Sequence, residues 1–216
     1  MSGRTGVAYT EWRWTLPREL THAQNVTLAQ DLLDASFGTT HPYVWAFHDP
    51  PAADGGSQPH VHVLFSARTV DGVERTAVQF FKRWNAAHPE RGGAQKDPRF
   101  SHFGAVKRER VLYTDIVNLH LAQHGHPARL HPDRLDVRGF ERTPEPRLLP
   151  SDSNAFKHHG VITEGLQVVL DHRATHASER ETEQGQARAY WAQREIELGL
   201  SRGMDRKDAV TRIRAD

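Results

Sequence analysis

Three short segments of the chain show patterns typical of β-strands. Residues 9–15 alternate in polarity, so Trp12 and Trp14 share one face of a strand that has one buried side. Residues 42–48 and 60–66 are short and rich in aromatic and branched side chains. Proline and glycine are frequent between the last two segments, which we therefore interpret as neighbouring strands joined by a loop.

Two longer segments show the spacing of apolar residues that is typical of helices. Thr21 and Gln24 match a capping box, and the leucines that follow predict a helix over residues 21–37. A second apolar stripe begins at Val111 and ends before Gly125, where a helix is predicted to stop. The first part of the chain is thus expected to combine strands with helices.

The other segments are less regular. Asp71-Gly72 marks a tight turn, after which residues 73–78 are predicted to form a short strand paired with the preceding one. Residues 126–156 are rich in proline, aspartate and arginine and are expected to be mostly loop. Charged and polar residues dominate residues 171–216, which indicates an exposed helical extension or a partly disordered tail.

Length and composition limit the class of protein. The 216 residues suffice for one domain, which we place over residues 1–165, with a charged, helical or partly disordered extension over residues 166–216. Lysine and arginine number 28 against 27 acidic residues, so attraction to nucleic acid would have to come from local clusters. Because there is no cysteine, disulfides and zinc–thiolate sites are excluded.

The sequence shows no signal for a membrane or for secretion. Neither an apolar run behind a basic start nor a run of about eighteen apolar residues occurs. We therefore expect a soluble, cytoplasmic protein without a membrane partner.

The 15 histidines include a group whose spacing suits metal ligation. His60 and His62 alternate with Val61 on a predicted strand, so both imidazoles lie on one face, with Cα atoms about 6–7 Å apart. If the loop returns the chain antiparallel, His48 on the preceding strand lies opposite this pair. Three neutral imidazoles would leave positions on a metal ion open to a phosphate oxygen and water.

Two other interpretations of these histidines stay open. A His-x-His pair in a strand is more often a pair of partly exposed polar residues than a metal site. Three histidines are also the ligand set of some zinc sites, as in carbonic-anhydrase-like chemistry.

A second cluster combines positive charge with aromatic rings. Between residues 80 and 110 the basic residues outnumber the acidic ones, and phenylalanine and tryptophan are interspersed. Basic groups neutralise phosphates and aromatic rings stack on bases, so this segment is a candidate for binding single-stranded DNA, with a solvated face as the alternative. The residues expected to contact DNA are Lys82, Arg83, Trp84, Lys96 and Arg99.

Several separate blocks of the sequence resemble a single family. The blocks are Trp14 to Thr21, Ala46 to His48, Gln58 to Val63, Gln79 to Asn85, Gly92 to Lys96 and Asn118 to Gly125. In this order and at these intervals they resemble the MobA/MobL plasmid relaxases, which belong to the His-hydrophobic-His (HUH) superfamily of nickases. The resemblance spans roughly residues 9–165.

This resemblance implies a fold, a cofactor and a reaction. The fold is α+β, with a five-stranded antiparallel sheet and flanking helices, and the cofactor is Mg²⁺ or Mn²⁺ held by His48, His60 and His62. The implied reaction is cleavage of one DNA strand at a plasmid transfer origin in conjugative mobilization, by a tyrosine that becomes joined to the 5′ end. The implied partners are single-stranded DNA and accessory mobilization proteins.

The nucleophilic tyrosine is the point at which the sequence departs from the family. Family members carry it in an N-terminal segment before the strand at residues 9–15, whereas this chain begins almost at that strand. We therefore expect some N-terminal elements to be missing, or to be supplied by a separate chain. Of the four tyrosines we favour Tyr9, because Tyr43 and Tyr113 occupy packing positions and Tyr190 lies in the unmatched tail.

Two charged residues of the first strand bear on the same site. Glu11 corresponds to an acidic position beside the active site, where it would accept a proton or orient a histidine, with a solvated strand residue as the alternative. Arg13 stands where another acid is common, which makes the surface more favourable to phosphate. The leading hypothesis is a metal-dependent relaxase, and the alternative is an inactive or truncated DNA-binding module.

Overall fold

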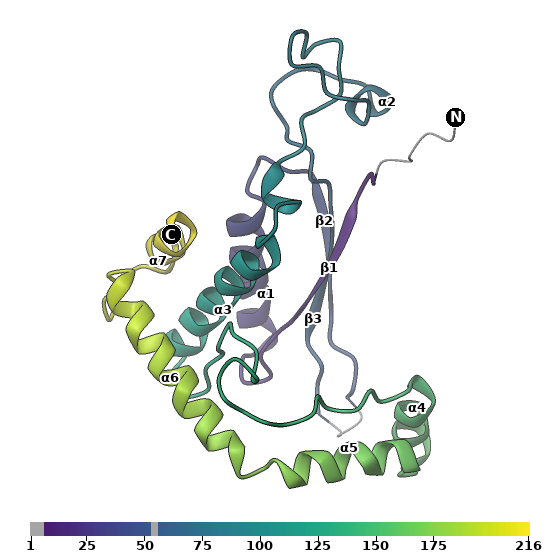
Figure 1. The fold of residues 1–216 in the computed structure, drawn as a ribbon, viewed down its shortest axis with the longest axis vertical. Helices are drawn as coiled ribbons and strands as arrows, with labels where there is room; N and C mark the ends of the chain where they lie inside the picture. Colours follow the sequence, from purple (N-terminus) through teal and green to yellow (C-terminus); the bar gives the residue numbers. More distant parts are fainter. Residues whose placement is uncertain (1–6, 53–55) are drawn as a thin grey trace.

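The computed structural model describes residues 7–52 and 56–216, and its elements are arranged as Figure 1 shows. Its strands are β1 (Thr10–Thr15), β2 (Tyr43–His48) and β3 (His60–Phe65). Its helices are α1 (His22–Ser36), α2 (Ala77–Phe80), α3 (Ala105–Gln123), α4 (Pro150–His159), α5 (Glu164–Thr175), α6 (Glu179–Glu197) and α7 (Arg206–Ala215), with a 3₁₀ turn at Pro98–Phe100. None of the helices in these ranges is long and apolar enough to span a membrane.

The strands form one antiparallel sheet in the order β1-β3-β2. His60 lies opposite Thr15 of β1 on one side and opposite His48 of β2 on the other. His62 lies opposite Arg13 of β1. Directly opposed residues of neighbouring strands project to the same face, so these side chains share one face of the sheet.

The other face of the sheet is buried beneath α1 and α3. Val61, Val63 and Phe65 alternate with the histidines along β3 and are almost inaccessible to solvent. They belong to one apolar cluster with residues of both helices, such as Leu32 of α1 and Ile116 of α3. Because the apolar residues of β3 must be covered, the histidine face is the one left open.

The helix predicted over residues 21–37 is confirmed as α1. The Thr21 hydroxyl accepts a hydrogen bond from the Gln24 N–H, and the Gln24 side-chain oxygen accepts one from the Thr21 N–H. These bonds complete the capping box. Gly38 follows the helix with a φ of +53°, a conformation that favours glycine.

Residues 73–78 do not form the predicted strand, although Gly72 has the positive φ of a turn, +77°. The Thr76 hydroxyl accepts the Gln79 N–H and begins α2 instead. The Arg75 side chain, 1% exposed, donates to the carbonyl oxygen of Gly92. Bonds from side chains thus satisfy backbone groups in this segment and take the place of a β-ladder.

The α+β class is confirmed, and the sheet of the described residues has three strands. The five-stranded sheet is therefore not confirmed. The irregular segment expected from residue 126 is without helix or strand up to Leu149, after which α4 begins.

The C-terminal residues form α5, α6 and α7, and the last two helices cover the outer side of α1 and α3 (Figure 1). Trp191 of α6 and Ile213 of α7 are buried in the same apolar cluster as the sheet. Asp115 of α3, fully buried, accepts hydrogen bonds from Tyr190 and Arg194 of α6. Part of the segment expected to be an extension therefore contributes to the core.

Candidate metal centre

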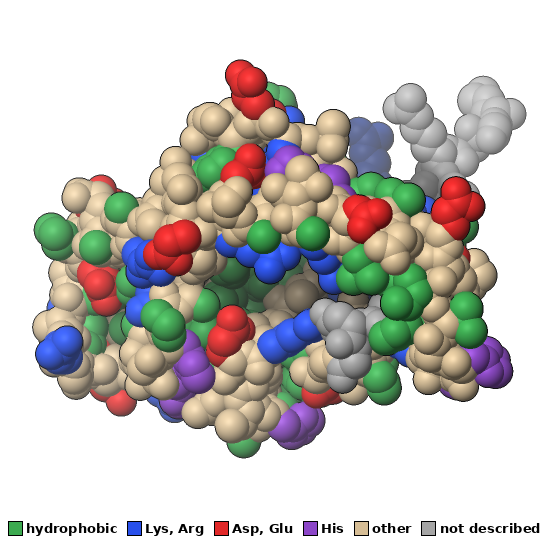
Figure 2. All heavy atoms as spheres, turned by 90° about the horizontal axis from the view of Figure 1, so that it is seen from below, with side chains coloured by type: hydrophobic (Ala, Val, Ile, Leu, Met, Phe, Trp, Pro, Cys, Tyr) green, Lys and Arg blue, Asp and Glu red, His purple; other side chains and the backbone are tan. Residues whose placement is uncertain are grey.

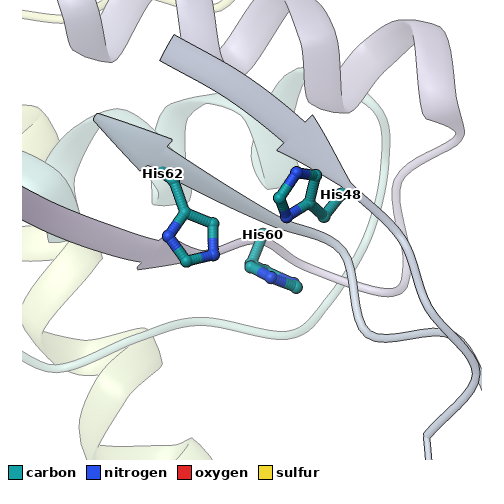
Figure 3. A group of neighbouring side chains, drawn as sticks. All are labelled: His48, His60 and His62. Atoms are coloured by element: carbon teal, nitrogen blue, oxygen red, sulfur yellow. The ribbon is translucent and has the colours of Figure 1, made fainter. Parts of the chain in front are cut away.

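Three histidines converge on the open face of the sheet, as Figure 3 shows. The centroid of the His48 ring lies 5.4 Å from that of His60 and 5.0 Å from that of His62. The centroids of the His60 and His62 rings are 5.1 Å apart. One ligand nitrogen from each lies within 4.8 Å of the others, and in the described ranges no other group of histidine, aspartate and glutamate meets this condition. The strand alternation predicted that these side chains would share a face, and the structure brings them together.

Hydrogen bonds determine which nitrogen two of these imidazoles can offer to a metal ion. Nδ1 of His60 lies 2.7 Å from the carbonyl oxygen of Gln58, and Nδ1 of His62 lies 2.6 Å from Oε1 of Glu11. Carbonyl and carboxylate oxygens accept hydrogen bonds, so each Nδ1 carries the proton and each Nε2 keeps its lone pair. Histidine ligands of metals in proteins are commonly held in this way.

Hydrogen bonds fix the two ends of the segment that joins β2 to β3, Asp49 and residues 58–59, beside the triad. The Gln58 N–H donates to Oδ1 of Asp49 at 3.0 Å, directly after His48 in the chain. The Leu16 N–H donates to the carbonyl oxygen of Pro59 at 2.8 Å, which extends the ladder of β1 and β3 past His60. Sequence reasoning missed the role of Gln58, because a backbone carbonyl leaves no signal in the residue type.

The donor set fits a divalent ion with open coordination positions. Imidazole nitrogen is a good ligand for Fe²⁺, Ni²⁺, Cu²⁺ and Zn²⁺, whereas Mg²⁺ prefers oxygen. His48 is exposed, and His60 and His62 are half-buried, so solvent and ligands can reach an ion held by the three nitrogens. The site is thus open, in contrast to the closed sites that metals with a structural role occupy.

Comparison with known proteins gives the family. The model of the MobA/MobL family matches residues 5–158. The chain belongs to the MobA/MobL family. It is 35% identical over 167 residues to Mobilization protein A of Escherichia coli, an alignment that covers 77% of this chain and 23% of that protein. It is 34% identical over 142 residues to the 43 kDa relaxation protein of Salmonella typhimurium, covering 63% of this chain and 38% of that protein. The chain therefore matches less than half the length of either relative.

Tyr9, which we favoured as the nucleophile in this family member, is not brought to the triad. It precedes Thr10, which lies opposite Phe65, whereas His60 lies at the other end of β3. The five steps along β3 between these positions correspond to about 17 Å. Tyr9 is 65% exposed at that far end.

The other tyrosines are engaged in packing or hydrogen bonding. The Tyr113 hydroxyl donates to the carbonyl oxygen of Thr15, and burial raises the pKa of Tyr113 to about 12. Burial is also the main cause that raises the pKa of Tyr43. The pKa of Tyr190 is raised by burial and by its hydrogen bond to Asp115.

Three of the expected DNA-binding residues lie in a segment that protrudes beyond the end of β3 (Figure 1). These residues are Lys82, Arg83 and Trp84, and all of them are exposed. The segment follows Phe65, so the length of the sheet separates its base from His60. If these residues bind DNA, they do so at a distance from the triad.

The two remaining residues of that group differ from each other. Lys96 is exposed and pairs with Arg68 in an isolated β-bridge at the base of the protruding segment. Arg99 is turned toward α1, where it donates to the carbonyl oxygen of Ser36 and lies 4.6 Å over the ring of Phe100. These contacts give Arg99 a packing role on the covered side of the sheet.

A cavity of about 900 Å³ lies between residues 134–145 and helices α5 and α6. Seen from below, the molecule is hollowed near the middle, with Lys and Arg side chains at the rim of the hollow (Figure 2). Acidic partners neutralise several arginines of the cavity: Arg142 lies 2.6 Å from Glu183, and Arg173 lies 2.8 Å from Glu145. The net charge of this cavity is therefore smaller than its number of arginines suggests.

Proposed function

We propose that this chain is the metal-binding part of a relaxase that cuts one strand of DNA at a plasmid transfer origin. The observation that carries the proposal is the triad, whose ligand nitrogens lie within 4.8 Å of one another on an open face. Membership of the MobA/MobL family supports it, as do relatives that are named for mobilization and relaxation.

The side chains of the site have separate tasks in this proposal. His48, His60 and His62 would hold Mg²⁺ or Mn²⁺, and the nitrogen donors favour Mn²⁺. A divalent ion there would withdraw charge from a phosphate oxygen and fix the position of the phosphate. Glu11 would accept the Nδ1 proton of His62, which fixes the orientation of the ring and leaves Nε2 as the nitrogen available to the ion.

The nucleophile decides which products form. Attack by a tyrosine leaves the protein joined to the DNA, whereas attack by water leaves free ends. Among the described tyrosines, Tyr9 is the one with an exposed side chain outside the core, so Tyr9→Phe is the variant to compare. If Tyr9 attacks, this variant loses the adduct but keeps metal binding.

A cleavage assay tests the proposal. The purified chain is incubated with single-stranded oligonucleotides that tile the DNA flanking its gene, in Mn²⁺ or in EDTA, and the products are run on denaturing gels with and without protease. We expect a cut at one position that requires the ion and is lost in His62→Ala. His158→Ala is the control, because His158 is exposed on α4 and is not one of the three candidate ligands. Cleavage in EDTA, or full cleavage by His62→Ala, would contradict the proposal.

The alternative is a module that binds transfer-origin DNA without cutting it. It is favoured by the position of Tyr9, at the opposite end of the sheet from His60. In the same assay this alternative gives retarded DNA on native gels and no cut strand under any condition.

A further inference from the structure

Arg13 lies beside the triad, and its positive charge has no acidic partner within the described part of the chain. It is exposed and stands directly opposite His62 in the register of β1 and β3. No hydrogen bond or ion pair of its guanidinium occurs among the described residues. The nearest carboxylate on the same strand face, Glu11, is bound to Nδ1 of His62.

The geometry of the ladder brings Arg13 close to the ion site. In an antiparallel ladder, opposed residue pairs that exchange backbone hydrogen bonds alternate with pairs that do not. Leu16 and Pro59 are a hydrogen-bonded pair, so Arg13 and His62, three positions further along the ladder, are a pair without backbone hydrogen bonds. In such pairs the Cβ atoms are about 4.5–5.5 Å apart. An arginine side chain is longer than this separation, so its guanidinium can reach a phosphate bound at the triad.

A groove of about 420 Å³ runs along the edge of β1 that does not pair with β3, between this strand and α3. Its lining includes Trp12, Arg13, Trp14, Val106, Arg110 and Tyr113. Arg110 and Val106 are exposed at the rim, Val106 by 73%. The groove thus combines apolar and aromatic walls with two guanidinium groups, and Arg13 connects it with the histidine face.

One acidic residue also borders the groove. Glu109 is half-buried, and its Oε2 accepts a hydrogen bond from the Ser36 hydroxyl at 3.4 Å. Its oxygen is therefore directed toward α1, and the groups free to meet a ligand are arginines. This combination favours a negatively charged ligand with flat rings.

We propose that Arg13 binds the phosphate beside the ion site and that the groove along β1 binds the adjoining nucleotide of a single DNA strand. The inference rests on the proposed function, because it assumes that the phosphate at the triad belongs to DNA. A guanidinium binds two phosphate oxygens at once, which a single imidazole cannot do. Aromatic walls accept any base, so the groove fixes the path of the strand without reading its sequence.

Equilibrium binding tests this assignment. A fluorescein-labelled thymidine 12-mer is titrated with protein in EDTA and in Mn²⁺, over a series of salt concentrations. We expect Arg13→Gln to weaken binding about five- to tenfold and to reduce the salt slope by about one. Arg202→Gln is the matched control, because Arg202 is exposed in the turn before α7. Arg13→Lys keeps the positive charge but cannot bind two phosphate oxygens at once in the way a guanidinium does. Its affinity for the 12-mer should therefore lie between those of Arg13→Gln and the parent.

A second pair of variants tests the groove. Val106→Glu places a negative charge at its rim and should weaken binding about as much as Arg13→Gln. Ile196→Glu is the control, because Ile196 is 75% exposed on α6, outside the lining of the groove. Neither exposed position is part of the core, so both variants should melt at the temperature of the parent.

The outcomes separate this inference from the proposed function. If the parent binds the 12-mer while Arg13→Gln and Val106→Glu match it, the inference is wrong. If the parent neither takes up Mn²⁺ nor binds DNA, the proposed function itself fails. Arg13→Gln should take up Mn²⁺ like the parent, because Arg13 is not a ligand, whereas His62→Ala should not.

Discussion

The imidazole of His62 shows how a neighbouring side chain decides what a histidine can do. A neutral imidazole exchanges its proton between two nitrogens, and only one of the two forms offers Nε2 as a ligand. Glu11 lies 2.6 Å from Nδ1 and selects that form. At the scale of single residues, we therefore expect a carboxylate that is not itself a ligand to contribute to metal affinity.

Glu11→Ala should lower the affinity for Mn²⁺ by about tenfold, because His62 loses the partner that fixes its tautomer. Glu11→Gln should have a smaller effect, since the amide oxygen still accepts the Nδ1 proton. Isothermal titration with MnCl₂ measures both. Glu74→Ala, at an exposed position without a described contact, is the control, and equal affinities in all four proteins would contradict the role given to Glu11.

At the scale of elements, β1 is held from two sides. One edge pairs with β3, and at the other edge the carbonyl oxygen of Thr15 accepts the hydroxyl of Tyr113 from α3. Thr15 lies opposite His60, so this bond connects α3 to the end of the sheet that carries the triad. Burial of Tyr113 favours its neutral form, which raises its pKa to about 12 from 10.0.

The stability of this connection should depend on pH in the alkaline range. Because the pKa of Tyr113 is higher in the folded chain, its contribution is complete below pH 10 and is lost as the pH rises toward 12. The difference amounts to about 1.4 kcal/mol at pH 11.

Urea unfolding at pH 8 and pH 11 measures this loss. Tyr113→Phe should unfold more easily at pH 8, by about 1 kcal/mol, because it lacks the bond to Thr15. Its further loss at pH 11 should be smaller than that of the parent by about 1.4 kcal/mol. Tyr9→Phe, at an exposed tyrosine, should keep the full pH dependence of the parent.

At the scale of the whole molecule, the C-terminal helices connect with the sheet through the two helices that cover it. Asp115 of α3 is fully buried and lies 2.9 Å from Arg194 of α6. The C-terminal Asp216 lies 2.8 Å from the same guanidinium. A charge this deep in the core is tolerated only with its partner, so α6 is held in one position against α3.

Arg194→Ala should lower the free energy of unfolding by about 3 kcal/mol, because it leaves a carboxylate buried without its counter-ion. Arg188→Ala is the matched control on the same helix. Its partner Glu181 is 83% exposed, so less than about 1 kcal/mol should be lost. Chemical denaturation at pH 7 measures both variants, and similar losses would contradict the importance of the buried pair.

Periodicity along the chain determined the parts of the fold that depend on neighbouring residues. Alternation fixed the two faces of each strand, so it placed His60 and His62 together and turned Val61 inward. The pair Thr21 and Gln24 marked the start of α1 because the capping box is a local structure. The two faces and the helix start follow from steric and hydrogen-bonding rules that act over a few residues.

Contacts between residues far apart in the chain were decided only by the tertiary structure. Residues 73–78 do not form the predicted strand, and the side chain of Arg75 is buried there instead. Arg99 donates a hydrogen bond to the carbonyl oxygen of Ser36 rather than facing solvent. Trp191 lies in a polar stretch, yet it is buried once α6 reaches the core. Whether a side chain is buried depends on which surfaces meet after folding, and that is set by the packing of the whole chain.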